Sequence, residues 1–575
     1  MANDTKHSPP PIAVTRPPLL SGAEALALSA VAAPAATVVV AYSLDRAGLA
    51  FPPVSLLAVF LGAAAAALAV LRPRIEWRLD ELTAWLAVVG AIFLWLLWIA
   101  TPSFLPPGSG ADLTHHLLLI QYIEAHWRLV HDPAVERFLG EMTGYTPGSH
   151  ILVAAAGAWT GTDGLRALYP VLAATIALKA GFVFLVARRV IATMIAESSA
   201  TARLVQLAFA CAASALLFAS HVYFLRSFVE NSFVAQVVAE LFAIVMWWSV
   251  VVWETGALSA VVFGAAGAAT FLTWPIWIGP PLVLAGVIAL TDREQSFVDR
   301  AKQLTVAVAP IVLVGVLYFA ARPAGLAMAA TTGAAPWPRA SAYAGWFLAL
   351  SGLGLAAAAM HRGTRIVTMF AGAILLQSAG LYLVAGPGAA EPYLALKMFY
   401  LLLYPQAVAS AVVLTEVWKA TTSLRLHQKA QVAIALFLVL TVLAAVAWPL
   451  RRAPRSVTTL KHPSISAPLE RAGLWARDHV PANCIEYLVD FDETAYWLHL
   501  AVLGNPRVTP RSLDPDTYKP DFAIARWLTP GGLTYGIADL ATLPRGVSEE
   551  LDVVQQFGTA AVVRQRGPSS CPSDQ

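Results

Sequence analysis

The stretch SFLPPGSGADLTHHLLLIQYIEAHWRLVHDPAVERFLGEMTGYTPGSH, residues 103–150, separates two long apolar regions of the chain. It is rich in ionisable side chains, among them Asp112, His115, His116, His126, His131 and His150. A connection this long usually carries function. The stretch therefore predicts where a functional site lies, and the apolar regions on either side of it predict how the rest of the chain folds.

The composition indicates an integral membrane protein. Of the 575 residues, 58% are hydrophobic and only 13% are charged, and the mean hydropathy is +0.65. Soluble domains carry about 25% charged residues. The net charge of +3 is small and dispersed, which argues against nucleic acid as a partner.

The apolar regions predict an α-helical polytopic bundle over residues 23–450. A bilayer core needs about 20 apolar residues per helix, and on that rule the chain contains about 13 spans. We expect them near 25–42, 51–71, 81–100, 164–187, 204–224, 232–253, 258–274, 276–291, 303–321, 343–361, 366–386, 393–418 and 430–449. The two spans around Trp274-Pro275 are short and predict a broken hairpin, because proline removes a helix donor. Residues 151–160 are too few to span, so we expect a buried or interfacial helix there.

The basic residues orient the bundle. If the N-terminus is cytoplasmic, Lys and Arg gather on the cytoplasmic side, as at Arg188-Arg189, and the outer loops hold fewer of them. The tail 1–22, rich in proline and polar residues, is then a disordered cytoplasmic segment, and 102–150 is an outer loop. The Ala-rich, Arg-over-Lys composition suggests a bacterial inner (plasma) membrane. The odd number of spans places the C-terminus in the periplasm.

From residue 451 the composition becomes that of a soluble domain. The segments LERAGLWARDHV, CIEYLV, TAYWLHLAVLG and AAVVRQR alternate between helical and strand patterns. They predict a small extracytoplasmic α/β domain over 451–575, next to the outer loop. Cys484 and Cys571 both lie in it. Whether they form a disulfide stays open, because pairing depends on a geometry that the sequence does not contain.

The first candidate motif is DLTHHLLLIQYIEAHW, which begins at Asp112 and has helical spacing. On a helix His115 and His116 follow Asp112 by three and four residues, so one face presents a carboxylate and two imidazoles. Such a group can act as a general base or bind a divalent metal. The same residues also fit a helix cap followed by two interfacial histidines.

Two further motifs lie at the outer ends of spans. Tyr145-Thr-Pro-Gly-Ser-His150 is a turn that leads into an apolar helix. Lys397 follows Tyr393 about one turn inside a later span, where an ionisable side chain is by default a functional candidate. It can bind phosphate at the level of the lipid headgroups. Snorkelling of the lysine to the interface is the alternative.

A fourth group surrounds residues 226–240. Arg226, Glu230 and Asn231 are expected on the outer side, either in a site or in a solvated loop. Glu240 lies inside the bilayer and needs a partner. Lys179 is the partner that we expect, in a structural ion pair.

Together these motifs resemble the GT-C superfamily of polytopic, polyprenyl-phosphate-sugar-dependent glycosyltransferases. The likeness rests on Asp112 in a large outer loop with His115 and His116, on the Tyr145–His150 turn, on Tyr393-x-x-x-Lys397, and on the C-terminal outer domain. Two features depart from the pattern. The acidic residue follows the third span rather than the first, and Thr146 replaces the usual proline.

The resemblance implies transfer of a sugar from a polyprenyl-phosphate donor to a cell-envelope glycan or lipid acceptor, with inversion. It implies Asp112 as general base, with His115 or His116 orienting it. The implied substrate-binding residues are Lys397, His150, Tyr145, Arg226, Glu230, Asn231 and Tyr393. No cofactor is required by this scheme. A divalent metal on Asp112 and His116 is left open.

Three alternatives remain at the level of the sequence, and one of them is a non-catalytic relative that retains the fold. A transporter or flippase of lipid-linked saccharides would also explain intramembrane charges and a broken hairpin. A metal-handling membrane protein would explain the clustered histidines, although their spacing beyond Asp112 to His116 is loose for a ligand set.

Overall fold

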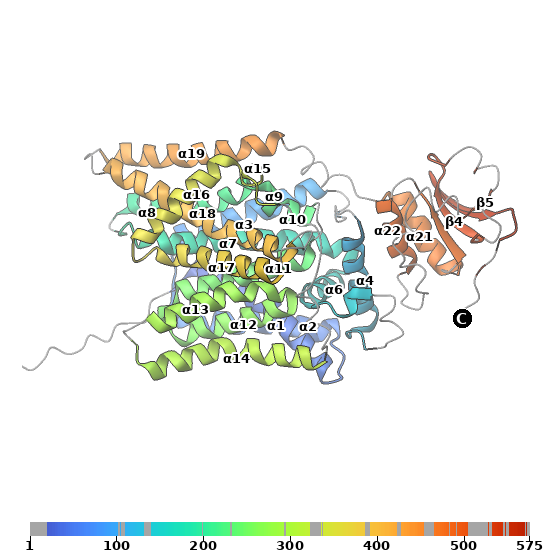
Figure 1. Ribbon diagram of the computed structural model, residues 1–575, viewed down its shortest axis with the longest axis horizontal. Helices are drawn as coiled ribbons and strands as arrows, with labels where there is room; N and C mark the ends of the chain where they lie inside the picture. Colours follow the sequence, from blue (N-terminus) through green and yellow to red (C-terminus); the bar gives the residue numbers. More distant parts are fainter. Residues whose placement is uncertain are drawn as a thin grey trace, which may run out of the picture.

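The fold was taken from a computed structural model, which describes residues 20–101, 104, 110–131, 140–197, 199–229, 233–291, 295–321, 335, 337–385, 392–422, 427–452, 465–481, 484–489, 492–503, 527, 532–543, 547, 551–569 and 571. Helices form one large bundle, and a small domain with a β-sheet lies at one end of it (Figure 1). The expected class, a polytopic α-helical protein with a small C-terminal α/β region, is confirmed.

Ten of the described helices are long and apolar enough to cross a membrane. They are α1 (Gly22–Arg46), α2 (Pro53–Leu71), α3 (Leu79–Ala100), α7 (Gly164–Ala192), α8 (Ala200–Leu216), α11 (Val234–Val251), α14 (Phe297–Ala321), α17 (Arg365–Ala385), α18 (Tyr393–Thr422) and α19 (Gln428–Arg452). Three shorter apolar helices are α12 (Ala257–Thr273), α13 (Gly279–Thr291) and α16 (Gly345–Met360). Each expected span therefore corresponds to one described helix.

Burial divides these helices into a core and a rim. In α11, 94% of the most apolar window is buried by the protein, whereas in α2 the figure is 11%. The rim helices expose large apolar side chains such as Leu61, Leu94, Leu313 and Phe437. Exposing this much apolar surface to water is unfavourable, whereas exposing it to lipid is not. The chain is accordingly a multi-pass membrane protein.

The middle of the bundle contains a buried polar network. Lys179 in α7 forms an ion pair with Glu240 in α11. The same carboxylate accepts a hydrogen bond from the Tyr404 hydroxyl in α18 at 2.5 Å and one from the Gln236 amide at 3.4 Å. The expected Lys179–Glu240 pair is confirmed, and it joins the three best-buried helices.

A charged network marks one end of the bundle. Glu24, in the first turn of α1, pairs with Arg189 near the end of α7, while Arg188 and Arg78 both pair with Glu197. Leu20 and Ser21 form strand β1 (Leu20–Ser21), which pairs with β2 (Ile75–Glu76). The expected tail, 1–22, overlaps β1 and the start of α1 at residues 20–22, and residues 1–19 lie outside the described residues.

The opposite end of the bundle carries two short helices from the long loop, α4 (Gly110–His126) and α6 (Gly148–Thr160). The predicted helix after Asp112 and the predicted non-spanning helix after His150 are both present. Between α12 and α13 the chain makes a 3₁₀ turn, η5 (Pro275–Ile278), which is the expected break at Trp274-Pro275. Shorter helical pieces at this end are η2 (Gly140–Thr143), α9 (His221–Phe224), α10 (Arg226–Val229) and α15 (Ala340–Tyr343).

The C-terminal region folds around a four-stranded sheet in the order β3-β4-β6-β5. The strands are β3 (Ile485–Leu488), β4 (Tyr535–Asp539), β5 (Leu551–Phe557) and β6 (Ala560–Gln565), and the helices are α21 (Ala467–His479) and α22 (Asp492–Leu503). β3 and β4 are parallel, whereas β6 is antiparallel to both β4 and β5. The four expected segments are confirmed, while β4 and β5 were not predicted.

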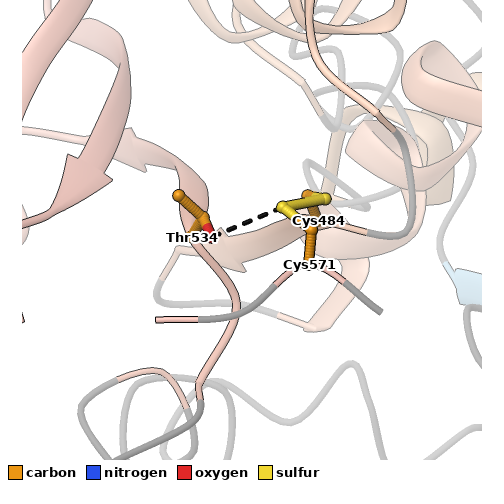
Figure 2. The surroundings of a disulfide bond; sticks show 3 residues. All are labelled: Cys484, Thr534 and Cys571. Atoms are coloured by element: carbon orange, nitrogen blue, oxygen red, sulfur yellow. Dashed lines mark hydrogen bonds between the residues drawn. A yellow bond between two sulfur atoms is a disulfide. The ribbon is translucent and has the colours of Figure 1, made fainter. Parts of the chain in front are cut away.

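This domain is closed by a disulfide and docked on the bundle. Cys484 and Cys571 are bonded, with their Cα atoms 4.8 Å apart. Thr534 Oγ1 lies 3.4 Å from Cys571 Sγ (Figure 2) and donates to it, because a disulfide sulfur carries no hydrogen. α22 packs against α4, and Glu470 of α21 lies 3.4 Å from Arg166 in the first turn of α7. The domain therefore covers the end of the bundle that holds the loop (Figure 1).

Candidate functional site

The central feature of the candidate site is a pair of buried histidines. His116 Nδ1 in α4 lies 2.9 Å from His150 Nε2 in the first turn of α6, and both side chains are buried. Tyr145 packs against both rings, with centroid distances of 5.2 Å to His116 and 5.7 Å to His150. Residues from two motifs that were predicted separately therefore form one cluster.

The backbone around His150 decides which nitrogen carries its proton. The carbonyl groups of Thr146 and Pro147 accept hydrogen bonds from the His150 ring. Because Nε2 faces His116, these bonds fall to Nδ1–H, and Nε2 then accepts from His116 Nδ1–H. Burial lowers the pKa of His150 to about 3, although the two carbonyls raise it in part. His150 is thus neutral near pH 7, and its Nε2 accepts the proton on His116 Nδ1, so that the acceptor nitrogen of His116 is Nε2.

The turn before α6 is clamped against the end of α12. The Thr146 hydroxyl donates to the Thr273 carbonyl at 2.6 Å, and the Tyr145 ring lies 5.9 Å from that of Trp274. A Cβ on Gly148 would come within 2.5 Å of Thr273 Oγ1 and 2.8 Å of the Leu272 carbonyl oxygen. Only glycine fits this crossing. Thr146, which departs from the family pattern, therefore has a structural role here.

The helix that carries His116 is held from its other end. The buried carboxylate of Asp45, at the end of α1, accepts from the Leu129 backbone N–H at 2.8 Å and lies 3.0 Å from His131 Nε2. Glu124 of α4 accepts a hydrogen bond from the Gly164 N–H at the start of α7, and burial raises the pKa of Glu124 to about 7. His131 is therefore part of this anchor. The ring of His126 stacks on Tyr122 in its own helix.

Other predicted site residues are only partly placed. Asp112 lies in α4, four residues before His116, but its side chain is outside the described residues, as are Glu230 and Asn231. His115 is half-buried. Within the described residues no group of three or more His, Cys, Asp or Glu side chains could hold a metal ion. His116 and His150 form a hydrogen bond with each other, so their rings would have to rotate before both could bind one metal ion.

Lys397 lies under aromatic rings. Its Nζ is 2.7 Å from the ring centroid of Phe233, 4.8 Å from that of Tyr393 and 5.5 Å from that of Tyr400, and the residue is 1% exposed. The snorkelling lysine considered from the sequence is not found. Stacking on aromatic faces stabilises the ammonium group in a place with little water.

Arg226 opens onto a cavity of about 490 Å³. Arg339 and Trp337 also line this cavity, and its described lining includes no carboxylate. Tyr223, three residues before Arg226, lies 4.8 Å from Tyr400, whose ring in turn contacts Lys397. Arg339 was not predicted, and an arginine after a Trp-Pro pair in a loop is the only signal that could have identified it.

The turn η5 lies between the histidine cluster and the start of α18, the helix that carries Lys397. On one side Trp274 contacts Tyr145. On the other side, the Gln377 amide donates to the Ile276 carbonyl at 2.5 Å and lies 3.7 Å from the sulfur of Met398, the residue after Lys397. The histidine cluster and Met398, the residue after Lys397, therefore lie on two sides of one turn.

The fold and site define a multi-pass membrane protein with buried titratable and cationic groups at one end of its bundle. No family model and no curated protein match the sequence. Among solved structures, the chain is similar to the Archaeoglobus fulgidus oligosaccharyltransferase in complex with Zn and sulfate, with 13% identity and a TM-score of 0.40 over 84% of this chain and 73% of that one. It is also similar to the arabinofuranosyltransferase AftD from Mycobacteria, with 14% identity and a TM-score of 0.43 over 84% of this chain and 40% of that one.

Proposed function

We propose that the chain transfers a sugar from a polyprenyl-phosphate donor to a cell-envelope glycan or lipid on the outer face of the membrane. One observation carries the proposal. The cluster of His116, on the helix of Asp112, with His150 and Tyr145 meets the start of the turn η5 at Trp274. On the other side of the turn, Gln377 links Ile276 to Met398, the residue after the cation Lys397. A base and an anion-binding group on the two sides of one turn suit a displacement reaction between them.

The donor half of the reaction needs positive charge. A lipid phosphate leaves as an anion, so it requires electrostatic stabilisation rather than a proton. Lys397 and Arg226 are the groups that we assign to it, with Tyr393 and Tyr145 beside the sugar. Arg226 lines a cavity of about 490 Å³ that is open to an anion. Glu230 and Asn231 follow Arg226 in the chain and complete the proposed substrate-binding set with His150.

The acceptor half needs a base. Asp112 is the proposed base, because residues four apart on a helix share a face, which puts it on the side of His116. His116, whose tautomer is set by His150, would orient the carboxylate and the acceptor hydroxyl, with His115 on the adjoining face. A single base without an enzymic nucleophile gives single displacement, with inversion at the anomeric carbon. A divalent metal on Asp112 and His116 is open, and elemental analysis of the purified protein decides it.

The proposed location follows from the same arrangement. Arg78, Arg188 and Arg189 mark the end of the bundle opposite the site, which is the cytoplasmic end by the positive-inside rule. The Cys484–Cys571 disulfide is suited to an oxidising compartment. We therefore propose a bacterial inner membrane, with the N-terminus cytoplasmic and the C-terminal domain periplasmic.

Asp112→Asn tests the proposal. In purified protein supplied with a polyprenyl-phosphate sugar and an envelope acceptor, we expect transfer to fall by about 10²–10⁴. His126→Gln is the matched control, because His126 is an exposed histidine on the same helix. Full activity of folded Asp112→Asn would contradict the assignment of the base.

A transporter or flippase of lipid-linked saccharides remains the alternative, and the break between α12 and α13 favours it. Transport needs two compartments, whereas sugar transfer does not. Product formation by the detergent-solubilised protein therefore supports the transferase. Movement of the lipid-linked saccharide across the membrane of proteoliposomes, with no product formed there or in detergent, supports the flippase.

A further inference from the structure

The two histidines of the candidate site are closed off from solvent. His116 is 6% exposed and His150 is 0% exposed. A glycan or lipid acceptor is too large to reach side chains this deeply buried, so part of the protein has to move before the proposed reaction begins. The part that moves must adjoin α4, the helix that carries His116.

Protein surrounds α4 on every side. The five consecutive residues from His116 to Ile120 are all buried. Because successive residues of a helix are about 100° apart, these five together cover its whole circumference. The helices α6 and α7 of the bundle pack against α4, and so does α22 of the C-terminal domain. The helix is therefore held between the bundle and that domain.

The first turn of α7 anchors both α4 and the C-terminal domain. Glu124 of α4 accepts a hydrogen bond from the Gly164 N–H. Two residues further on, Arg166 Nη1 lies 2.5 Å from Asp163 Oδ2, and Arg166 Nη2 lies 3.4 Å from Glu470 Oε1 in α21. The Arg166 side chain is 46% exposed in this pair. An ion pair so open to solvent contributes little to stability, so it breaks readily.

The C-terminal domain has the features of a unit that moves without unfolding. Leu488, Trp527 and Val563 belong to a hydrophobic core of its own. The Cys484–Cys571 disulfide closes the domain independently of the bundle. Figure 1 shows it at the end of the bundle, on the side of α4. A domain with its own core keeps its fold when it separates from a neighbour.

We propose that the C-terminal domain is a lid on the candidate site, and that Arg166 is a positioning residue that holds the lid closed through Glu470. In the closed state α22 supports α4 and keeps His116 in contact with His150. When the Arg166–Glu470 pair opens, the domain leaves α4, which then separates from α6 and admits the acceptor. The identity of the acceptor rests on the proposed function, whereas the lid itself does not.

Chemical modification of His116 tests the lid. The probe is diethyl pyrocarbonate, which acylates the free nitrogen of a neutral imidazole, added to the full-length protein in nanodiscs and mapped by mass spectrometry. Glu470→Arg opposes two arginines, and the double variant with Arg166→Glu restores an ion pair in reverse order. Arg471→Glu is the control, because Arg471 is an exposed residue of the same helix. His126, exposed on α4, is the internal reference.

We expect Glu470→Arg to raise the modification rate of His116 relative to His126 by about fivefold, the factor that an exposed ion pair supports. The double variant should return to the wild-type rate, and Arg471→Glu should keep it. Glu470→Gln, which only removes the charge, should give a smaller rise and replaces Glu470→Arg if that protein does not fold. Equal modification in the wild type and both Glu470 variants would overturn the proposal. So would a rise in Arg471→Glu, or a double variant as reactive as Glu470→Arg.

Fixing the lid closed tests whether the acceptor enters beneath it. The double variant Arg166→Cys with Glu470→Cys, bridged by a bismaleimide, should transfer sugar about tenfold more slowly than either single-cysteine variant treated in the same way. Bridged protein that transfers at the single-variant rate would refute this route of entry. If the wild type transfers no sugar while His116 responds as expected, the proposed function alone fails. If sugar is transferred but His116 does not respond, the lid alone fails.

Discussion

The imidazole of His116 meets that of His150 at 2.9 Å, between two helices that are 34 residues apart at this contact. One proton is shared by the pair, because two facing lone pairs or two facing N–H groups would repel. The carbonyls of Thr146 and Pro147 fix its position on the His116 side. This contact fixes the orientation of both rings. The burial of His150 also makes the stability of the protein depend on pH.

Acid should destabilise the protein through His150. The pKa of His150 is lowered from 6.5 to about 3 by burial, so the unfolded chain binds the proton more readily. The unfolding free energy should then fall as the pH drops below about 6.5, by at most about 1.4 kcal/mol per pH unit. Thermal unfolding of wild type and His150→Gln at several pH values measures this. His126→Gln should keep the wild-type slope, and an unchanged slope in His150→Gln would contradict the assignment.

Glu124 should act with the opposite sign. Burial raises its pKa to about 7, so the folded protein binds a proton that the unfolded chain binds only near pH 4.5. The stability that Glu124 contributes is present at low pH and is lost as the pH rises through 7. Glu124→Gln should remove this loss and make unfolding less sensitive to pH between 5 and 8. A steeper dependence in the variant would show that the carboxyl is ionised in the fold.

Gly148 should be intolerant of any side chain. An added Cβ meets the Leu272 carbonyl at 2.8 Å as well as Thr273 Oγ1, and backbone atoms cannot move aside cheaply. We expect Gly148→Ala to cost about 1–3 kcal/mol and to loosen the clamp on His150. Gly286→Ala is the control, because a Cβ there meets nothing within 4 Å. If both variants unfold at the wild-type temperature, α6 does not cross α12 this closely.

The Lys179–Glu240 pair should be costly to break and cheap to replace. Lys179→Met leaves a buried carboxylate with only Tyr404 and Gln236 as partners, and we expect a loss of about 3–5 kcal/mol. The double variant Lys179→Met with Glu240→Gln leaves no unpaired charge and should recover most of that loss. A double-mutant cycle on thermal unfolding measures the coupling, and additive effects would refute the pair.

The disulfide should stabilise the C-terminal domain without being needed for the bundle. Cys484 and Cys571 are 87 positions apart, so the bond removes much chain entropy from the unfolded domain, worth about 2–4 kcal/mol. The double variant Cys484→Ala with Cys571→Ala should lower the protease resistance of residues 465–571. The helical bundle, α1–α19, should stay folded in detergent. Unfolding of the whole protein in this variant would mean that the two regions fold as one unit.

Much of the fold was predictable because a membrane restricts the choices. Each span must satisfy its own backbone hydrogen bonds, so a run of about 20 apolar residues specifies a helix without knowledge of its neighbours. The non-spanning helix α6 and the break at Trp274-Pro275 follow from length and from proline in the same local way. The strands β4 and β5 escaped prediction, because short strands take their stability from partners elsewhere in the chain.

For the site, the sequence by itself determined the residue types and the end of the bundle on which they lie. Asp112, His116, His150 and Lys397 could be named because ionisable groups at the ends of apolar helices are costly and therefore conspicuous. The tertiary structure decided which of them meet. The contacts of His116 with His150, of Tyr145 with Trp274, and of Lys397 with Phe233 join segments far apart in the chain. Such contacts depend on how helices cross and which glycine lets them approach, and no local pattern encodes that packing.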